Sequence, residues 1–164
     1  KHTFATKNHS LSGITLPQLW TMMCRHARHI DWITYGFRLS FLHLLATINT
    51  VVSVIEWAVY GSRIHKQELN DRPVFILGHP RSGTTLIHNI MSKDPSFAYC
   101  TTFMCGFPST FLCMEGAKKY LAGIIDKTRP MDNMELNFDL PQEDELATQM
   151  LSGGVSPYMC LFFM

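Results

Sequence analysis

The chain has 164 residues, long enough for one domain with its own core. Apolar residues make up 46% of it and charged residues 16%, a globular composition that excludes an intrinsically disordered chain. The net charge is +1, from 14 Lys plus Arg against 13 Asp plus Glu, and no basic stripe is visible, so nothing in the sequence indicates a nucleic-acid partner.

The cysteines are scattered through the chain with no Cys-x-x-Cys pair. Their odd number and loose spacing indicate reduced thiols, most of them small buried hydrophobic residues, rather than a disulfide framework or a zinc site. We therefore expect no metal centre and favour a reducing compartment, in the cytoplasm or at a membrane. The cysteines are Cys24, Cys100, Cys105, Cys113 and Cys160.

The two ends of the sequence indicate a piece of a longer protein. The chain begins with Lys1 rather than Met and stops in the apolar run 161–164. A polar connector at 67–72 is the best internal boundary. We expect a helical N-terminal region over residues 1–66 and part of a nucleotide-binding domain over residues 67–164.

The first helix of the N-terminal region is predicted to begin near Pro17, a residue that is tolerated in the first turn of a helix. This helix carries a basic cluster. We interpret the cluster as a solvated face, with contact to an anionic ligand or a lipid as the alternative. The cluster consists of Arg25, His26, Arg28 and His29.

Segment 30–60 is the most apolar part of the chain and is predicted to form a long helix with a polar stripe. No residue between Arg38 and Glu56 carries a formal charge. Three interpretations stay open: a buried amphipathic helix, a helix on a membrane surface, and a membrane span, which needs about 20 apolar residues. The stripe favours the first two. It consists of Ser40, His43, Thr47, Thr50 and Ser53.

Residues 73–91 read as a strand, a tight loop and a helix. The apolar run 74–77 is short and bounded by loop-forming residues, which is typical of a strand buried on both faces. A glycine loop at 78–83 follows, and then apolar residues recur at helical spacing. Such a loop directs backbone N–H groups and the positive end of the helix dipole at one point. It therefore predicts a site for a phosphate or sulfate group.

A second parallel strand is predicted at 97–100, after the helix has ended near Pro95. The two strands and the helix between them would form a βαβ unit. The expected fold class is therefore α/β, with a P-loop-like parallel sheet flanked by helices and preceded by the long N-terminal helices.

The spacing Gly78-x-x-x-x-Gly83 matches the start of a Walker A loop, but the next residue does not. Walker A loops carry a lysine there, and this chain carries Thr84. The cationic residue of this loop is instead Arg81, which lies between the two glycines and has a planar guanidinium that suits anions. These differences argue against an ATPase, a GTPase or a nucleotide kinase. We keep this class of P-loop proteins as the first alternative function.

The loop resembles that of the sulfotransferases, whose Pro-(Lys/Arg)-Ser-Gly-Thr-Thr motif matches Pro80–Thr85 at every position. Residues 129–134 and 140–145 resemble the Arg-Pro-x-Asp-Asn and Pro-Gln-Glu-Asp-Glu motifs of a branch found in bacteria and some microbial eukaryotes, and Tyr60–Ile64 also fits that branch. The resemblance implies a sulfotransferase domain that uses 3′-phosphoadenosine 5′-phosphosulfate (PAPS). Residues 67–164 would be its N-terminal half.

The resemblance also implies roles for the loop. Its backbone N–H groups and hydroxyls would hold the 5′-phosphate of PAPS. Arg81 would stabilise charge on the bridging oxygen as the sulfuryl group passes to a hydroxyl or amine. The acceptor would be a small molecule, a lipid or a glycan. The predicted donor-binding residues are His79, Pro80, Arg81, Ser82, Gly83, Thr84 and Thr85.

A general base must take the proton of the acceptor. The acids at 143–145 open a predicted helix, so they either complement its dipole or supply that base. Tyrosyl-protein sulfotransferases share the loop and carry a glutamate base at a point where this chain has Thr101 and Thr102. The predicted catalytic residues are therefore Arg81 and a base, either Glu143 or Asp144, with His88 in reserve.

The features by which the family holds the 3′-phosphate, an Arg and Ser pair and a Gly-rich loop with Lys, are not found in this sequence. We therefore expect the chain to hold half of a donor site and to be poorly active alone. The second alternative function is non-enzymatic: a membrane-associated protein whose long helix matters and whose loop is a relic.

Overall fold

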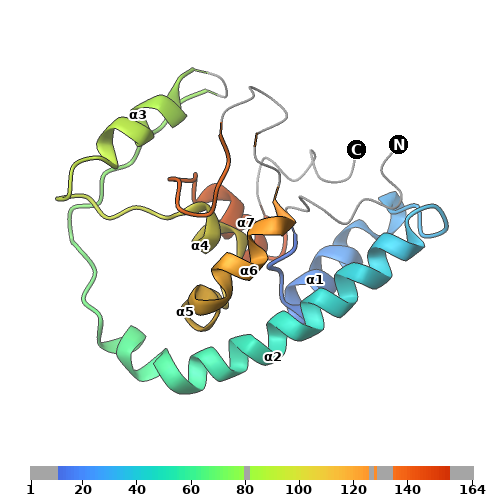
Figure 1. The fold of residues 1–164 in the computed structure, drawn as a ribbon. Coiled ribbons are helices and arrows are strands. Elements are labelled where there is room, and N and C mark those ends of the chain that lie inside the picture. Colours follow the sequence, from blue (N-terminus) through green and yellow to red (C-terminus); the bar gives the residue numbers. More distant parts are fainter. Residues whose placement is uncertain (1–10, 80–81, 126–127, 129–134, 156–164) are drawn as a thin grey trace.

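The structure is a computed structural model that describes residues 11–79, 82–125, 128 and 135–155. Within these ranges every regular element is a helix (Figure 1). The α-helices are α1 (Leu16–His26), α2 (Gly36–Lys66), α3 (Thr84–Met91), α4 (Thr102–Gly106), α5 (Phe111–Met114), α6 (Lys118–Leu121) and α7 (Glu145–Leu151). Short 3₁₀ helices occupy Ala27–His29 (η1), Glu115–Ala117 (η2) and Ala122–Ile124 (η3).

The predicted parallel sheet is absent from these residues, so the α/β prediction is wrong. Residues 74–77 form no strand and pair with no described segment. Val74, Phe75 and Leu77 are 58%, 76% and 89% exposed, whereas a strand buried on both faces was expected. A parallel strand is stable only with partners along its edges and helices over its faces, and the described part of the chain supplies neither here.

The second predicted strand, 97–100, is also absent. The end of this segment lies instead against residues 140–142, through an isolated antiparallel bridge and backbone hydrogen bonds. The segment is therefore tied to the acid-rich region and not to residues 74–77. The bonds run from Thr102 N to Leu140 O (2.8 Å) and from Gln142 N to Cys100 O (3.0 Å).

The longest element is α2, with 31 residues, or about 46 Å at 1.5 Å per residue. It contains most of the helix predicted at 30–60 and runs along one edge of the molecule (Figure 1). Its last turn carries Arg63, His65 and Lys66. Positive charge there complements the negative end of the helix dipole.

Three helices that are distant in sequence meet in one hydrophobic cluster. Leu19 and Met22 come from α1, Leu42 and Ala46 from α2, and Met150 from α7, and all are buried. The apolar residues of α1 recur at helical spacing, which places them on one side. Because α7 is part of this core, the acid-rich segment just before it has a fixed position relative to α2.

Polar groups of α2 also face the core. The Asn49 amide donates to the backbone oxygens of Ser12 (2.7 Å) and Ile14 (3.1 Å). The Thr50 hydroxyl accepts from the backbone N–H of Leu16 (2.9 Å). These bonds hold the segment before α1 against α2, and they make the inward face of α2 partly polar.

A second, aromatic cluster joins α4 to the segment before α7. The ring centroid of Phe103 lies 5.3 Å from that of Phe107 and 5.2 Å from that of Phe138. Next to this cluster, the buried carboxylate of Glu56 accepts a hydrogen bond from the backbone N–H of Cys113 (2.8 Å). That bond ties α2 to the first turn of α5.

Candidate active site

The glycine loop ends in a left-handed turn that opens α3. Ser82 donates twice to the backbone oxygen of His79, from its N–H (3.1 Å) and from its hydroxyl (2.6 Å). Gly83 follows with a φ of +96°, a conformation that favours glycine. Pro80 and Arg81, which the sequence predicts as donor-binding residues, lie outside the described residues.

The N-terminus of α3 has no side-chain cap in the described part of the chain. The first N–H groups of a helix have no partner within it, so those of Thr84 and Thr85 are available to an anion. A Cβ built on Gly78 would lie 2.6 Å from Thr84 Cγ2 and 2.8 Å from Ser82 Oγ. The chain therefore folds tightly around this helix end, and a larger residue at position 78 would displace the side chains of Ser82 and Thr84.

Replacing Gly83 with alanine should weaken anion binding at this turn. A side chain at positive φ costs about 1–2 kcal/mol, which the loop relieves by leaving the observed conformation. We expect the affinity for adenosine 3′,5′-bisphosphate, measured by isothermal titration, to fall by about 5- to 30-fold. Gly116→Ala is the matched control, because its added methyl group would meet nothing within 4 Å. Equal affinity in the two variants would show that the turn is not needed.

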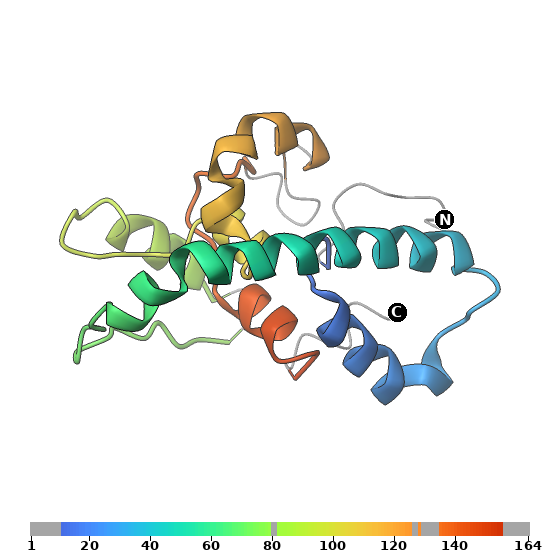
Figure 2. The ribbon, with the colours of Figure 1, turned by 90° about the horizontal axis from the view of Figure 1, so that it is seen from below.

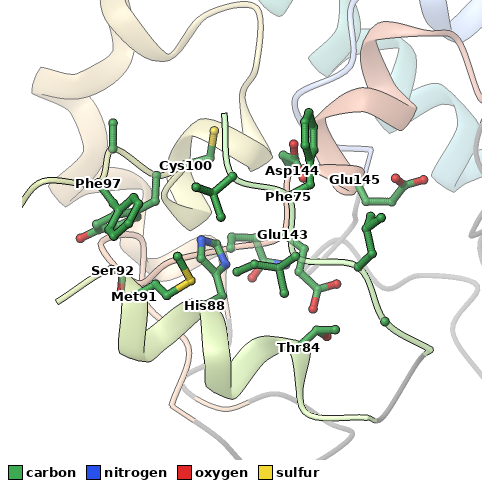
Figure 3. Close-up of a pocket in the computed structure, with 17 residues that line it drawn as sticks. Phe75, Thr84, His88, Met91, Ser92, Phe97, Cys100, Glu143, Asp144 and Glu145 are labelled. Atoms are coloured by element: carbon green, nitrogen blue, oxygen red, sulfur yellow. The ribbon is translucent and has the colours of Figure 1, made fainter. Parts of the chain in front are cut away.

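An open cleft of about 730 Å³ adjoins the start of α3 (Figure 3). Residues 74–78 and 97–100 supply most of its apolar lining, and α3 and residues 142–145 supply most of its polar side chains. The two segments predicted as strands thus lie on one cleft, although they do not form a sheet.

The cleft brings the loop helix and the acid-rich segment together. The Thr85 hydroxyl donates to the Glu143 carboxylate (3.1 Å) across 58 positions of sequence. Both side chains are half-buried. Glu143 is therefore a carboxylate held beside the uncapped end of α3, where a bound anion would lie.

The other predicted bases lie on the same cleft in different settings. Asp144 is exposed at the N-cap position of α7, and Glu145 is in the first turn of that helix, where its charge complements the dipole. His88 points into the cleft from α3 and packs edge-on against Tyr99, with ring centroids 6.3 Å apart. No motif in the sequence singles out Tyr99.

Thr101 and Thr102 have structural roles. The Thr101 hydroxyl caps α4 by accepting from the backbone N–H of Met104 (3.3 Å), and the Thr102 hydroxyl donates to Leu140 O (3.0 Å). Both threonines thus help to hold the segment that leads into Glu143.

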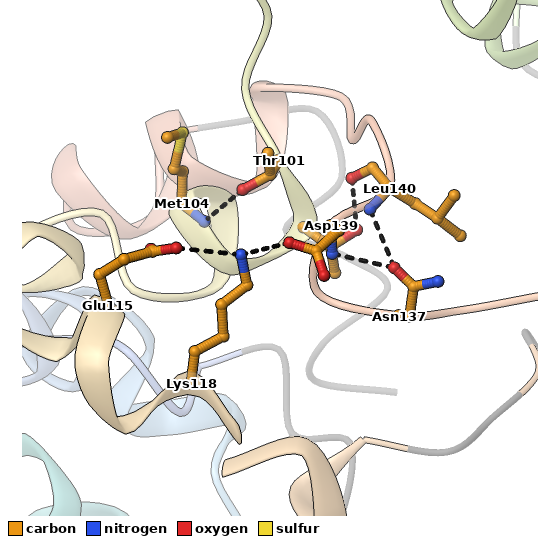
Figure 4. A network of polar contacts seen from close by, with 8 residues as sticks. Thr101, Met104, Glu115, Lys118, Asn137, Asp139 and Leu140 are labelled. Carbon is orange, nitrogen blue, oxygen red and sulfur yellow. Dashed lines mark hydrogen bonds and ion pairs between the residues drawn. The ribbon is translucent and has the colours of Figure 1, made fainter. Parts of the chain in front are cut away.

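A network of charged and polar side chains holds residues 137–140, which precede the acids at 143–145 (Figure 4). The Lys118 ammonium bonds to the carboxylates of Glu115 and Asp139. The hydrogen bond that the Lys118 ammonium donates to Asp139 raises the pKa of Lys118, because it stabilises the charged form of the lysine. The Asn137 amide oxygen accepts from the N–H groups of Asp139 (2.9 Å) and Leu140 (3.1 Å). The turn that precedes the acids is therefore well defined.

One feature of the cleft was missed at the level of sequence, where most of the cysteines were interpreted as small buried hydrophobic residues. Cys100 lines the cleft and is exposed, and a hydrogen bond from the Cys105 thiol lowers its pKa to about 7. Burial and the Asp144 carboxylate act in the opposite direction. The pKa of Cys105 is raised, because its proton is held in that bond.

Alkylation of Cys100 should therefore respond to pH near neutrality. The thiolate is the reactive form, so the rate with iodoacetamide, followed by peptide mass spectrometry, should rise with a midpoint at about pH 7. In Cys105→Ala the stabilising donor is lost, and the midpoint should move up towards the ordinary thiol value of about 8.5. Cys113→Ala is the control. An unchanged midpoint in Cys105→Ala would show that the Cys105 thiol does not cause the lowered pKa of Cys100.

Comparison with known proteins shows which family this region resembles. Residues 73–149 match the model of the sulfotransferase family. Two curated relatives, each named omega-hydroxy-beta-dihydromenaquinone-9 sulfotransferase Stf3, come from Mycobacterium bovis and Mycobacterium tuberculosis. Each is 36% identical over 119 residues, which cover 73% of this chain but only 30% of the relative. No solved structure matches the chain.

The matched region contains the glycine loop, α3 and the acid-rich segment, and it therefore contains every segment that lines the cleft. The predicted resemblance to the sulfotransferases is confirmed at the level of the family over these residues. Residues 73–149 are therefore similar to the sulfotransferase family, both in the family model and in the two relatives.

Proposed function

We propose that the protein transfers a sulfuryl group from PAPS to a hydroxyl or amine acceptor. The observation that carries this proposal is the 3.1 Å hydrogen bond from Thr85 to Glu143. It puts a proton acceptor beside the uncapped N-terminus of a helix. Sulfuryl transfer needs both groups close together, one to hold the phosphosulfate and the other to deprotonate the attacking acceptor.

The donor is proposed to bind through its 5′ end. The N–H groups of Thr84 and Thr85 open α3, which has no side-chain cap among the described residues, and the positive end of the helix dipole adds to their attraction for an anion. The threonine hydroxyls add hydrogen-bond donors. His79 and Ser82 shape the loop through the two hydrogen bonds between them. Arg81 is assigned to the bridging oxygen, where a permanent cation stabilises the charge that grows as the S–O bond breaks.

Glu143 is proposed as the general base. The acceptor oxygen or nitrogen attacks the sulfur, the bond between sulfur and the bridging oxygen breaks, and adenosine 3′,5′-bisphosphate leaves with the electron pair. The acceptor's proton passes to the Glu143 carboxylate. Glu143 is preferred over Asp144 because Glu143 is half-buried and bonded to Thr85, whereas Asp144 is exposed at the start of α7. His88 is the remaining alternative on the cleft.

The acceptor is proposed to be a hydroxyl on an apolar molecule, such as a lipid. Phe75, Leu77 and Phe97 lie on the cleft with much of their surface exposed, which suits an apolar group. The relatives are named for a menaquinone derivative that carries a hydroxyl. Because the chain covers 30% of those relatives, the acceptor of the whole protein is inferred only as a chemical class.

The proposal is tested with sulfur-labelled PAPS and the full-length gene product. A long-chain primary alcohol, a phenol and a primary amine serve as acceptors. We expect labelled product in an amount equal to the adenosine 3′,5′-bisphosphate released, with no need for magnesium. Turnover of ATP with magnesium but not of PAPS would favour a nucleotide kinase or NTPase. Binding of neither nucleotide would favour a non-enzymatic role.

A further inference from the structure

The helix α2 carries apolar side chains on both of its sides. Its inward face combines the buried core residues Leu42 and Ala46 with the buried polar residues Asn49 and Glu56, which bond to the segment before α1 and to α5. Its other side carries an outward stripe of apolar side chains, each between 49% and 60% exposed. Their spacing of three, four or seven follows the period of the helix. The stripe consists of Phe37, Leu44, Ile48, Val51, Ile55 and Val59.

No described segment covers this side of α2. In Figure 1 the helix lies at the lower edge, with α1 and α5 above it. Figure 2, seen from below, shows it crossing the front of the molecule with nothing over it. The stripe extends from Phe37 to Val59, about 33 Å at 1.5 Å per residue, and an exposed apolar surface that is continuous over such a length indicates a binding surface.

Two hydroxyls near the stripe form hydrogen bonds within α2 itself. The Ser40 hydroxyl donates to Gly36 O (3.0 Å), and the Thr47 hydroxyl donates to His43 O (2.8 Å). Glu56, the first formally charged residue after Arg38, points inward to the N–H of Cys113. A surface whose hydroxyls are satisfied by its own helix can enter hydrocarbon without losing hydrogen bonds.

Positive charge lies at one end of the stripe. Arg63, His65 and Lys66 are exposed in the last turn of α2, beyond the final apolar residue of the stripe. Cations that flank an apolar face complement the anionic headgroups of a bilayer, while the apolar side chains reach the acyl chains. The positive charge beside the stripe therefore favours a lipid surface over an uncharged partner as the surface that the stripe binds.

We propose that the outward stripe of α2 lies on the surface of a lipid bilayer, with the helix axis parallel to the membrane. By length and composition α2 could also cross a membrane. A crossing is disfavoured because α1 and α5 pack along the inward face, so their polar helix ends would be drawn into hydrocarbon. This inference rests on α2 alone and does not depend on sulfuryl transfer.

Flotation with lipid vesicles tests the surface. The chain is mixed with vesicles of phosphatidylcholine, alone or with phosphatidylglycerol, and centrifuged through a density gradient. We expect flotation with both, stronger with the anionic lipid and weakened there by salt. Val51→Glu places a charge on the stripe and should lower the partition coefficient about tenfold or more. Leu69→Glu is the matched control at a site 87% exposed outside α2, and it should float like the parent.

A second measurement reports where the stripe lies. In a background with the native cysteines replaced by serine, a nitroxide attached at Val51→Cys should become accessible to oxygen and protected from a water-soluble nickel chelate when vesicles are added. A nitroxide at Leu69→Cys should not. Absence of flotation, or equal flotation of the two Glu variants, would overturn the proposal. So would a dimer in the absence of lipid that Val51→Glu dissociates, because a second copy would then cover the stripe.

Discussion

Replacing Glu143 with glutamine is expected to lower kcat by about 10²- to 10⁴-fold, the usual contribution of a general base. Glutamine keeps the size of the side chain and can still accept from the Thr85 hydroxyl, so the cleft should keep its shape. It cannot take the proton of the acceptor. The affinity for PAPS should change little, since the 5′ end is held by the loop and α3. Initial rates with labelled PAPS and direct titration separate the two quantities.

Asp144→Asn is the matched control for this experiment. Asp144 is the next residue in the chain and lies on the same cleft, but it is exposed at the N-cap position of α7. It should keep kcat within a few-fold of the parent. If Asp144→Asn or His88→Asn loses turnover while Glu143→Gln keeps it, the base has been assigned to the wrong residue.

Replacing Gly13 with alanine should destabilise the fold by more than about 3 kcal/mol, above the usual range for overpacking. A Cβ there would lie 1.8 Å from the backbone oxygen of Gly106 and 2.8 Å from Phe107 Cα. Backbone atoms cannot turn aside as a flexible side chain can, so the two segments must separate. That movement would also disturb the adjoining clusters around Leu19 and Phe103. Urea unfolding, followed by far-ultraviolet circular dichroism, measures the loss.

The control substitution is Gly36→Ala, at the first residue of α2. A methyl group there would meet nothing within 4 Å, and alanine favours the helix by about 0.5–1 kcal/mol over glycine. This variant should be as stable as the parent or slightly more so. Similar unfolding midpoints for the two variants would mean that the backbones at positions 13 and 106 are not in close contact.

The glycine loop and its helix could be predicted because their signals are local. A glycine loop followed by apolar residues at helical spacing predicts a tight turn and then a helix, and α3 starts at Thr84, directly after Gly83. The strand at 74–77 could not be judged in this way. Its residues have strand-like character, but pairing depends on partners elsewhere in the chain, and none of the described segments provides one.

The acid-rich segment shows a second limit of local patterns. The sequence left the acids at 143–145 equally open to a helix-capping role and to a catalytic one. The structure separates them, with Glu145 in the first turn of α7 and Glu143 turned to Thr85. That contact joins two segments 58 positions apart, and no local spacing encodes it.

The orientation of α2 was also beyond the reach of the sequence. Its polar stripe predicted a two-sided helix, and the usual expectation is that the apolar side faces the protein. Here Asn49, Thr50 and Glu56 face the protein because each finds a specific backbone partner there. Such partners lie outside the helix and are invisible in its own pattern.

Calorimetric titration of PAPS into this chain and into Arg81→Ala measures whether the turn at residues 78–85 binds the phosphosulfate end of PAPS. We expect PAPS to bind without magnesium, and to bind at least about tenfold more weakly in the variant, because a charge-assisted contact is lost. ATP should show no binding that depends on magnesium. Unchanged PAPS affinity in Arg81→Ala, or tighter binding of magnesium ATP than of PAPS, would mean that the turn is not a PAPS site.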